Sequence, residues 1–184
     1  MKDFPPMTTP YTPLASHPAP AGFRFHSYHK TFRCKFPLAV VWAYFNRTKT
    51  FTQGQPPFFF VEFVSPEAGK PANFRPGVMN THHGFFLHLP AVITLVEAKK
   101  RRHMAYLYGA WVLNFRLLRP TALNFEFQQT REGETLVHLE LNSWVRPWFS
   151  GIWNLGLRAF WGMFGLGLNR EIHRYLRAKK TATR

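Results

Sequence analysis

The C-terminal segment places the strongest constraint on the fold of this chain. It reads WFSGIWNLGLRAFWGMFGLGLNREIHRYLRAKK from Trp148 to Lys180, apolar and aromatic at first and basic at its end. At about 100° per residue, Trp153, Phe160 and Phe164 fall on one side of a helix. The opposite side collects small and polar residues: Gly151, Arg158, Gly162, Gly165 and Asn169. The spacing predicts one long amphipathic helix that closes over another layer.

A transmembrane helix is the main alternative for this segment. It would place Arg158 near the bilayer centre, beside Asn154, at a cost of roughly 2.5–3.5 kcal/mol on insertion scales. We therefore expect a helix packed on a sheet, with residues 170–180 in solvent; a core helix with a charged end fits the same pattern. Glycines between positions 151 and 167 each cost about 0.5–1 kcal/mol relative to alanine, which indicates close packing, a kink or room for a ligand.

The rest of the sequence predicts a single domain with an N-terminal arm. At 184 residues, the chain is long enough for one sizeable core and short for two. Residues 1–28 are rich in proline, so we expect an extended arm there and a folded domain over residues 29–184. The arm lacks the apolar stretch of a secretory signal peptide, and we expect a cytoplasmic protein that can also associate with a membrane surface.

Hydrophobic periodicity within the domain indicates α+β structure. Alternation over residues 29–36 predicts a first strand, and Pro37 begins a short helix that ends near Asn46. A second short helix is predicted at 47–51. Further strands are predicted at 58–64, 78–89, 92–98, 103–113, 123–130 and 135–145. This order predicts a curved antiparallel sheet with the long C-terminal helix laid across it.

Composition limits the classes of function. Hydrophobic residues make up 46% and aromatic residues 17% of the chain, which excludes a disordered protein. The formal net charge of +15 favours an anionic partner such as a phospholipid surface, a nucleic acid or an acidic ligand. The single cysteine, Cys34, excludes an internal disulfide, and no Cys/His spacing indicates a metal site. No Gly-rich phosphate loop and no serine nucleophile motif is found, and we expect no cofactor.

Four stretches of the sequence resemble a known superfamily: PLAVVWAYFN at 37–46, FRPGVMNTHHG at 74–84, VITLVEAKKRRHMAYLYG at 92–109 and REGETLVHLELNSWV at 131–145. With the order of elements, they are similar to the START-like, or polyketide cyclase/dehydrase-like (SRPBCC), helix-grip superfamily. The resemblance covers about residues 29–180 and implies a deep, mostly apolar cavity between sheet and helix. It implies a lipid, sterol, polyketide, plant hormone or quinone as ligand, and it supplies no universal catalytic set.

Strand alternation selects candidate residues for the wall of this cavity. If the apolar face of the strand at 78–89 points inward, the ligand-binding candidates are Met79, Thr81, His83, Phe85, Leu87, Tyr106, Tyr108, Phe125, Phe127, Leu139, Trp153, Phe160 and Phe164. His83 is the polar group best placed to orient a ligand or move a proton, with a structural or surface histidine as the alternative. His82 and His88 then fall on the other face, and a shift of one residue would exchange the two faces.

Three functions remain open on this basis. The leading hypothesis is a non-enzymatic protein that binds or transfers a hydrophobic, lipid-like molecule in an internal cavity, with transient docking to anionic membranes. The second is a cyclase or dehydratase with His83 as general acid/base. The third is a peripheral membrane or nucleic-acid-binding protein whose interior is filled by its own aromatic side chains. The basic run KKRRH at 99–103 is interpreted as a solvated hairpin turn, which gives nucleic-acid binding little support.

Overall fold

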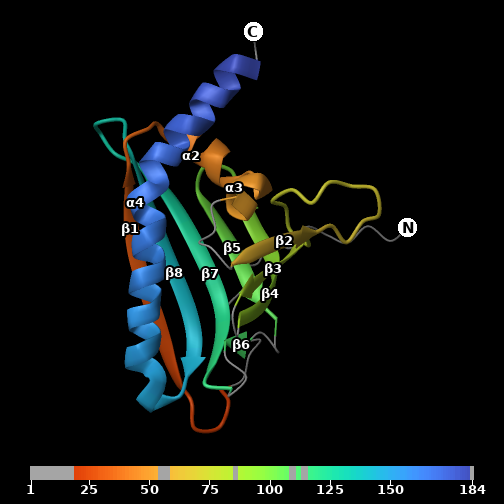
Figure 1. The fold of residues 1–184 in the computed structure, drawn as a ribbon, viewed down its shortest axis with the longest axis vertical. Helices are drawn as coiled ribbons and strands as arrows, with labels where there is room; N and C mark the ends of the chain where they lie inside the picture. The colour runs from red at the N-terminus through yellow and green to blue at the C-terminus, as the bar shows by residue number, and fades with distance from the viewer. Residues whose placement is uncertain (1–18, 54–58, 85–86, 108–110, 113–115, 183–184) are drawn as a thin grey trace.

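A curved antiparallel sheet and one long helix make up the structure (Figure 1). The computed structural model describes residues 19–53, 59–84, 87–107, 111–112 and 116–182. The strands are β1 (Arg24–Cys34), β2 (Phe60–Val64), β3 (Met79–Gly84), β4 (Leu87–Glu97), β5 (Arg101–Tyr106), β6 (Trp111–Val112), β7 (Leu118–Gln129) and β8 (Thr135–Val145). The sheet follows the order β1-β8-β7-β5-β4-β3-β2, and β6 pairs with β4 off this path.

The two short helices and the long C-terminal helix lie where the sequence pattern predicts them, and a 3-10 turn that was not predicted precedes the long helix. They are α2 (Leu38–Phe45), α3 (Thr48–Gln53), the single 3-10 turn η1 (Pro147–Phe149) and α4 (Ser150–Ala182). In Figure 1, α4 runs along the sheet beside β1 and β8, and its C-terminal half passes α2. Pro37 precedes α2 with a φ of −60°, a value that its ring imposes and that suits the start of a helix. The α+β helix-grip architecture is therefore confirmed.

The alternating segment at 135–145 forms β8 with the predicted limits. Val137, Leu139 and Leu141 are buried on its inner face, whereas the residues between them are only partly buried. β8 pairs with β1 on one side and β7 on the other, so it is a central strand. β1 begins at Arg24 rather than His29, because residues 24–28 continue the pairing with β8.

The prediction of a single strand over residues 78–89 is wrong. The chain forms two strands there, β3 and β4, which pair with each other from Met79↔Val92 to Gly84↔Leu87. β4 continues through Pro90, which lies between the strands predicted at 78–89 and 92–98. A strand tolerates proline where no amide donor is needed, and the Pro90 carbonyl still accepts a hydrogen bond from the Leu107 amide at 2.8 Å.

The long helix packs on the sheet through its aromatic side, as predicted. Leu157, Trp161, Leu168 and Ile172 are buried there. Two residues expected on the opposite side also contact the sheet, because the packed face is wider than the aromatic stripe. A Cβ atom on Gly165 would lie 3.0 Å from the Phe32 ring, and the Asn169 side chain accepts a hydrogen bond from the Lys35 amide at 2.9 Å.

The other glycines of α4 face open space, so close packing explains only Gly165. Among the described residues, no helix combines the length and the apolar character that a membrane crossing requires. The helix is therefore one layer of the fold, and its inner side forms a wall of the interior.

Candidate functional site

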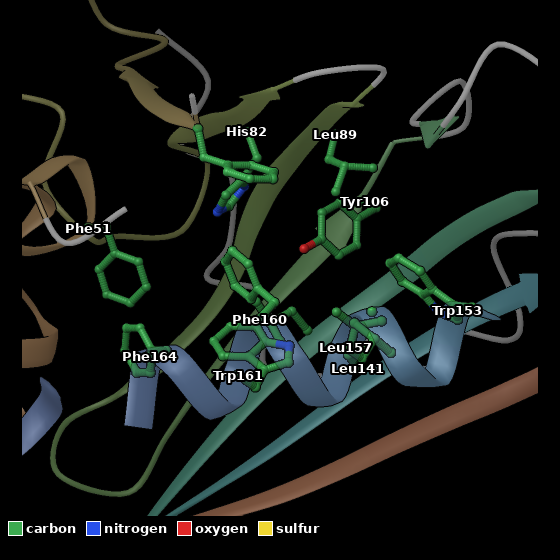
Figure 2. A pocket seen from close by; sticks show the side chains of 13 residues that line it. Phe51, His82, Leu89, Tyr106, Leu141, Trp153, Leu157, Phe160, Trp161 and Phe164 are labelled. Atoms are coloured by element: carbon green, nitrogen blue, oxygen red, sulfur yellow. The ribbon is translucent and has the colours of Figure 1, made fainter. Parts of the chain in front are cut away.

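A cavity of about 250 Å³ lies between the inner face of the sheet and α4 (Figure 2). From α4 it is bordered by Trp153, Gly156, Leu157, Phe160, Trp161 and Phe164. The sheet contributes His82, Leu89, Tyr106, Leu123 and Leu141, and Phe51 and Phe59 complete the wall. Every side chain in this wall is apolar or aromatic except for the imidazole of His82 and the polar tips of tyrosine and tryptophan.

Register explains why residues far apart in the sequence meet in this wall. His82 of β3 is paired directly with Leu89 of β4, and Leu123 of β7 with Leu141 of β8. Since neighbouring residues across a sheet point to the same face, each pair presents two side chains to the cavity together. On α4, Trp153, Leu157 and Trp161 follow one another at four-residue intervals and cover the same space from the opposite side.

Two polar side chains face the cavity without a partner. Neither the imidazole of His82 nor the hydroxyl of Tyr106 forms a hydrogen bond with another described residue, and the Nδ1 atom of His82 is buried. Figure 2 shows the His82 ring and the Tyr106 hydroxyl on the same side of the cavity, facing α4. Buried polar groups normally have partners, so this pair is suited to a polar group on a ligand.

Burial keeps both groups neutral. It lowers the pKa of His82 to about 4, with a smaller contribution from the charge of neighbouring His83. Burial also raises the pKa of the Tyr106 hydroxyl above its usual value. At neutral pH the pair therefore offers a hydroxyl donor and a neutral imidazole, which can donate or accept a hydrogen bond according to its tautomer.

The structure brings together only part of the predicted set of site residues. Tyr106, Trp153, Phe160 and Phe164 border the cavity. A second group, consisting of Phe125, Phe127 and Leu139, is buried in the adjoining core and does not border it. Phe85 and Tyr108 lie outside the described residues, as does the side chain of Leu87.

The residues of the segment at 78–84 that point inward are the ones that alternate with the predicted set. Val78 and Asn80 are buried and His82 borders the cavity, whereas Met79, Thr81 and His83 lie on the other face of β3. The segment MNTHHG lacks the regular apolar alternation that would identify its inner face.

His83 lies outside the cavity, on the outer face of the sheet. Its Nε2 atom is 3.7 Å from the Glu62 carboxylate, and its ring lies beside that of His88, with 5.4 Å between the centroids. The proton-transfer role considered for His83 therefore has no geometric support.

A buried arginine lies behind one wall of the cavity. Arg102 is 2% exposed, and its guanidinium lies over the rings of Phe51, Phe74 and Phe125 at 4.8, 4.0 and 5.0 Å. Its Nη1 atom donates a hydrogen bond to the Phe45 carbonyl at the end of α2, at 2.6 Å. Burial lowers the pKa of Arg102 to about 9. The interpretation of residues 99–103 as a solvated turn is therefore wrong for this residue, because its side chain points inward.

No group of three or more histidine, cysteine or acidic residues that could hold a metal ion is found in the part of the chain that the structure describes.

Several cavity residues were absent from the predicted set, among them Phe51, Phe59, His82, Leu89 and Trp161. Helical spacing was the signal for Trp161, which is four residues from both Leu157 and Gly165 on the packed side of α4.

The sequence matches no family model and no curated protein. Solved structures share the fold. Norcoclaurine synthase from Thalictrum flavum, in complex with dopamine and hydroxybenzaldehyde, superposes with a TM-score of 0.59 at 12% identity, covering 83% of this chain and 89% of its own. Protein NE0264 from Nitrosomonas europaea superposes with a TM-score of 0.57 at 17% identity, and the match covers 86% of this chain and 99% of that protein. Ara h 8.0201 superposes with a TM-score of 0.55 at 10% identity, and the match covers 82% of this chain and 99% of that protein. At these identities the likeness concerns the fold.

Proposed function

We propose that this chain, which has the helix-grip fold of the START-like superfamily, binds a compact hydrophobic molecule in the cavity between its sheet and α4. The observation that carries the proposal is a cavity of about 250 Å³ with an almost wholly apolar wall and one unpartnered polar pair. That volume is near the low end for small-molecule sites, which favours a compact, lipid-like ligand over a long-chain lipid. The helix-grip fold of norcoclaurine synthase, which accommodates dopamine and hydroxybenzaldehyde, supports a ligand of this size.

Burial of apolar surface would supply most of the affinity. At about 25 cal/mol per Å², a ligand that buries about 200 Å² of apolar surface gains about 5 kcal/mol before the costs of association. A hydrogen bond to Tyr106 or His82 adds about 1 kcal/mol and fixes the orientation of the ligand.

Charge sets the chemical class of the ligand. No lysine, arginine, aspartate or glutamate is among the described residues that border the cavity. A ligand carboxylate there would lose its hydration without gaining a cationic partner, because Arg102 is enclosed behind the Phe51 ring. We therefore expect a neutral ligand with a hydroxyl or carbonyl group.

Transfer of such a ligand would also use transient docking to an anionic membrane, which the net charge of +15 favours.

The experiment is extraction of the purified protein with organic solvent under denaturing conditions, followed by mass spectrometry. Leu89→Trp fills the cavity from β4, and Val64→Trp makes the same addition on the exposed edge strand β2 as a control. We expect a neutral apolar compound in stoichiometric amount from wild type and Val64→Trp, and its loss from folded Leu89→Trp. A compound retained equally by both variants, or a clean extract from wild type that also binds no neutral hydrophobic probe, would contradict the proposal.

A further inference from the structure

The outer side of α4 exposes large apolar side chains that the cavity does not use. Ile152, Leu155, Met163 and Leu166 are 58%, 69%, 56% and 89% exposed, and Trp148 in η1 is 67% exposed. The helical residues are spaced by three, eight and three positions, which places them in one stripe on the side opposite Leu157 and Trp161. We call these five residues the outer stripe.

A stripe of this kind needs an explanation. Single exposed apolar residues are common, but monomeric proteins rarely expose contiguous apolar patches larger than a few hundred Å², and the largest patch on a protein surface is often functional. None of the five residues borders the cavity. The residues of the outer stripe therefore contribute neither to the cavity wall nor to the core.

The same side of α4 becomes basic toward its C-terminal end. Arg170 follows Leu166 by four residues, and Arg174 and Arg177 continue the spacing. The sole acidic residue of α4 is Glu171, which pairs with Arg174 at 2.6 Å. One side of a single helix thus presents apolar side chains over its first half and cations over its second.

This combination selects among the partners that could cover the stripe. A stable protein dimer buries about 800 Å² per partner from about 20–30 residues, far more than one helical stripe offers, and two copies would each carry a charge of +15. A nucleic acid would pair with the arginines and leave the apolar half uncovered. An anionic bilayer accommodates both halves, because apolar side chains enter the region between headgroups and acyl chains while arginines contact phosphates.

We propose that the outer side of α4 docks onto an anionic lipid bilayer, with the outer stripe inserted at the interface and Arg170, Arg174 and Arg177 against lipid phosphates. This inference rests on the docking step of the proposed function and names its surface. Since the inner side of α4 walls the cavity, docking places the cavity within about one helix diameter, roughly 10 Å, of the bilayer.

The test measures cosedimentation with vesicles made of equal parts phosphatidylcholine and phosphatidylserine, and with vesicles of phosphatidylcholine alone. The double variant Leu155→Glu/Leu166→Glu removes the apolar contact, and Val64→Glu on β2 is its control. The double variant Arg170→Gln/Arg177→Gln removes two charges, and Lys30→Gln/Arg131→Gln removes two exposed charges from other elements.

We expect wild type to bind the anionic vesicles, with a loss of about fivefold in affinity for each α4 arginine removed and at least tenfold for the leucine pair. The control variants should bind within about twofold of wild type, because their sites lie away from the docking surface. Ligand retention, measured on the same preparations by extraction, should not change in any of these variants.

Other outcomes would overturn the inference in distinguishable ways. Binding that every variant retains would move the docking surface elsewhere and leave the docking step intact. Absence of wild-type binding would remove the docking step itself, while the cavity proposal still depends on the extraction result. A sedimentation coefficient that indicates a dimer in wild type and a monomer in Leu155→Glu/Leu166→Glu would assign the outer stripe to a second copy of this chain.

Discussion

Arg102 shows how a single residue can be charged, buried and still compatible with a stable core. Its guanidinium contacts three phenylalanine rings, and its hydrogen bond satisfies a carbonyl at the C-terminal end of α2, where a positive charge is favourable. No carboxylate pairs with it in the part of the chain that the structure describes. The cation–π contacts and the hydrogen bond at the helix end offset part of the cost of its burial, because the Nε and Nη2 atoms of Arg102 are buried without a hydrogen-bond partner among the described residues.

Arg102→Ala and Arg102→Met separate the packing of this side chain from its charge. We expect Arg102→Ala to lower the free energy of unfolding by about 3 kcal/mol, because it opens a cavity and leaves the Phe45 carbonyl unpaired. Arg102→Met keeps most of the volume and removes the buried charge, so its cost should stay below about 1.5 kcal/mol. Urea denaturation measures both values. Equal losses in the two variants would show that the charge, rather than the packing, dominates.

For individual polar residues, the sequence pattern did not predict which way the side chain points. His82 and His83 are adjacent and chemically identical, so only the face of the strand decides which one borders the cavity. In β8, regular apolar alternation identified the inner face correctly, whereas in β3 the residues MNTHHG gave no such pattern. Arg102 was misplaced for a related reason, because a run of basic residues gives no indication that one of them points inward.

At the scale of elements, the pattern predicted helices and strongly alternating strands better than turns. The limits of β8 and the existence of α2, α3 and α4 follow from periodicity and from Pro37. The strand predicted at 78–89 runs through Gly84, where β3 ends, and stops before Pro90, through which β4 continues, so the pattern does not show the hairpin of β3 and β4. The sequence also did not show that α4 contacts β1 through Gly165 and Asn169, because small residues carry no apolar signal.

Glycine substitutions in α4 provide a test of its packing. A Cβ atom on Gly162 would meet open space, so Gly162→Ala should raise the free energy of unfolding by about 0.5–1 kcal/mol through helix propensity. At Gly165 a Cβ atom would lie 3.0 Å from Phe32, whose ring packs against Phe164 with centroids 5.5 Å apart. We expect Gly165→Ala to lower the free energy of unfolding by about 1–3 kcal/mol. Thermal denaturation gives the sign of each change, and stabilisation by both would mean that Phe32 moves freely.

For the molecule as a whole, the element order and the aromatic surplus led to the correct architecture, because a long helix with one aromatic side needs a sheet to cover. The cavity could be expected only from the resemblance, since side-chain volumes in a sequence do not show whether the interior is filled. The outer stripe could not be separated from the packed side, because both sides of α4 are apolar over its first half. The helix packs through Leu157, Trp161, Leu168 and Ile172, and apolar residues on its other side, such as Leu155 and Leu166, stay exposed.

Two histidines in the interior, His103, which is buried, and His82, which borders the cavity, should make the stability of the whole molecule depend on pH. Burial lowers the pKa of both His82 and His103 to about 4, below the ordinary value of 6.5. Between pH 6.5 and about 4, the unfolded chain binds protons at these positions that the folded chain does not, so acidification favours unfolding. The free energy of unfolding should be level above about pH 7 and fall below it by at most about 1.4 kcal/mol per pH unit for each histidine.

His82→Phe distinguishes this effect from general acid denaturation. The variant cannot titrate at position 82, so its stability should fall less steeply than that of wild type between pH 6.5 and 4.5, while the contribution of His103 remains. Below that window the carboxylates of Glu67, Glu97 and Glu140, whose pKa values are lowered in the folded chain, add a loss common to both proteins. Urea denaturation of ligand-free protein across this range measures the slopes. Identical slopes would mean that the pKa of His82 is the same in the folded and the unfolded chain, which would contradict the lowering that burial causes.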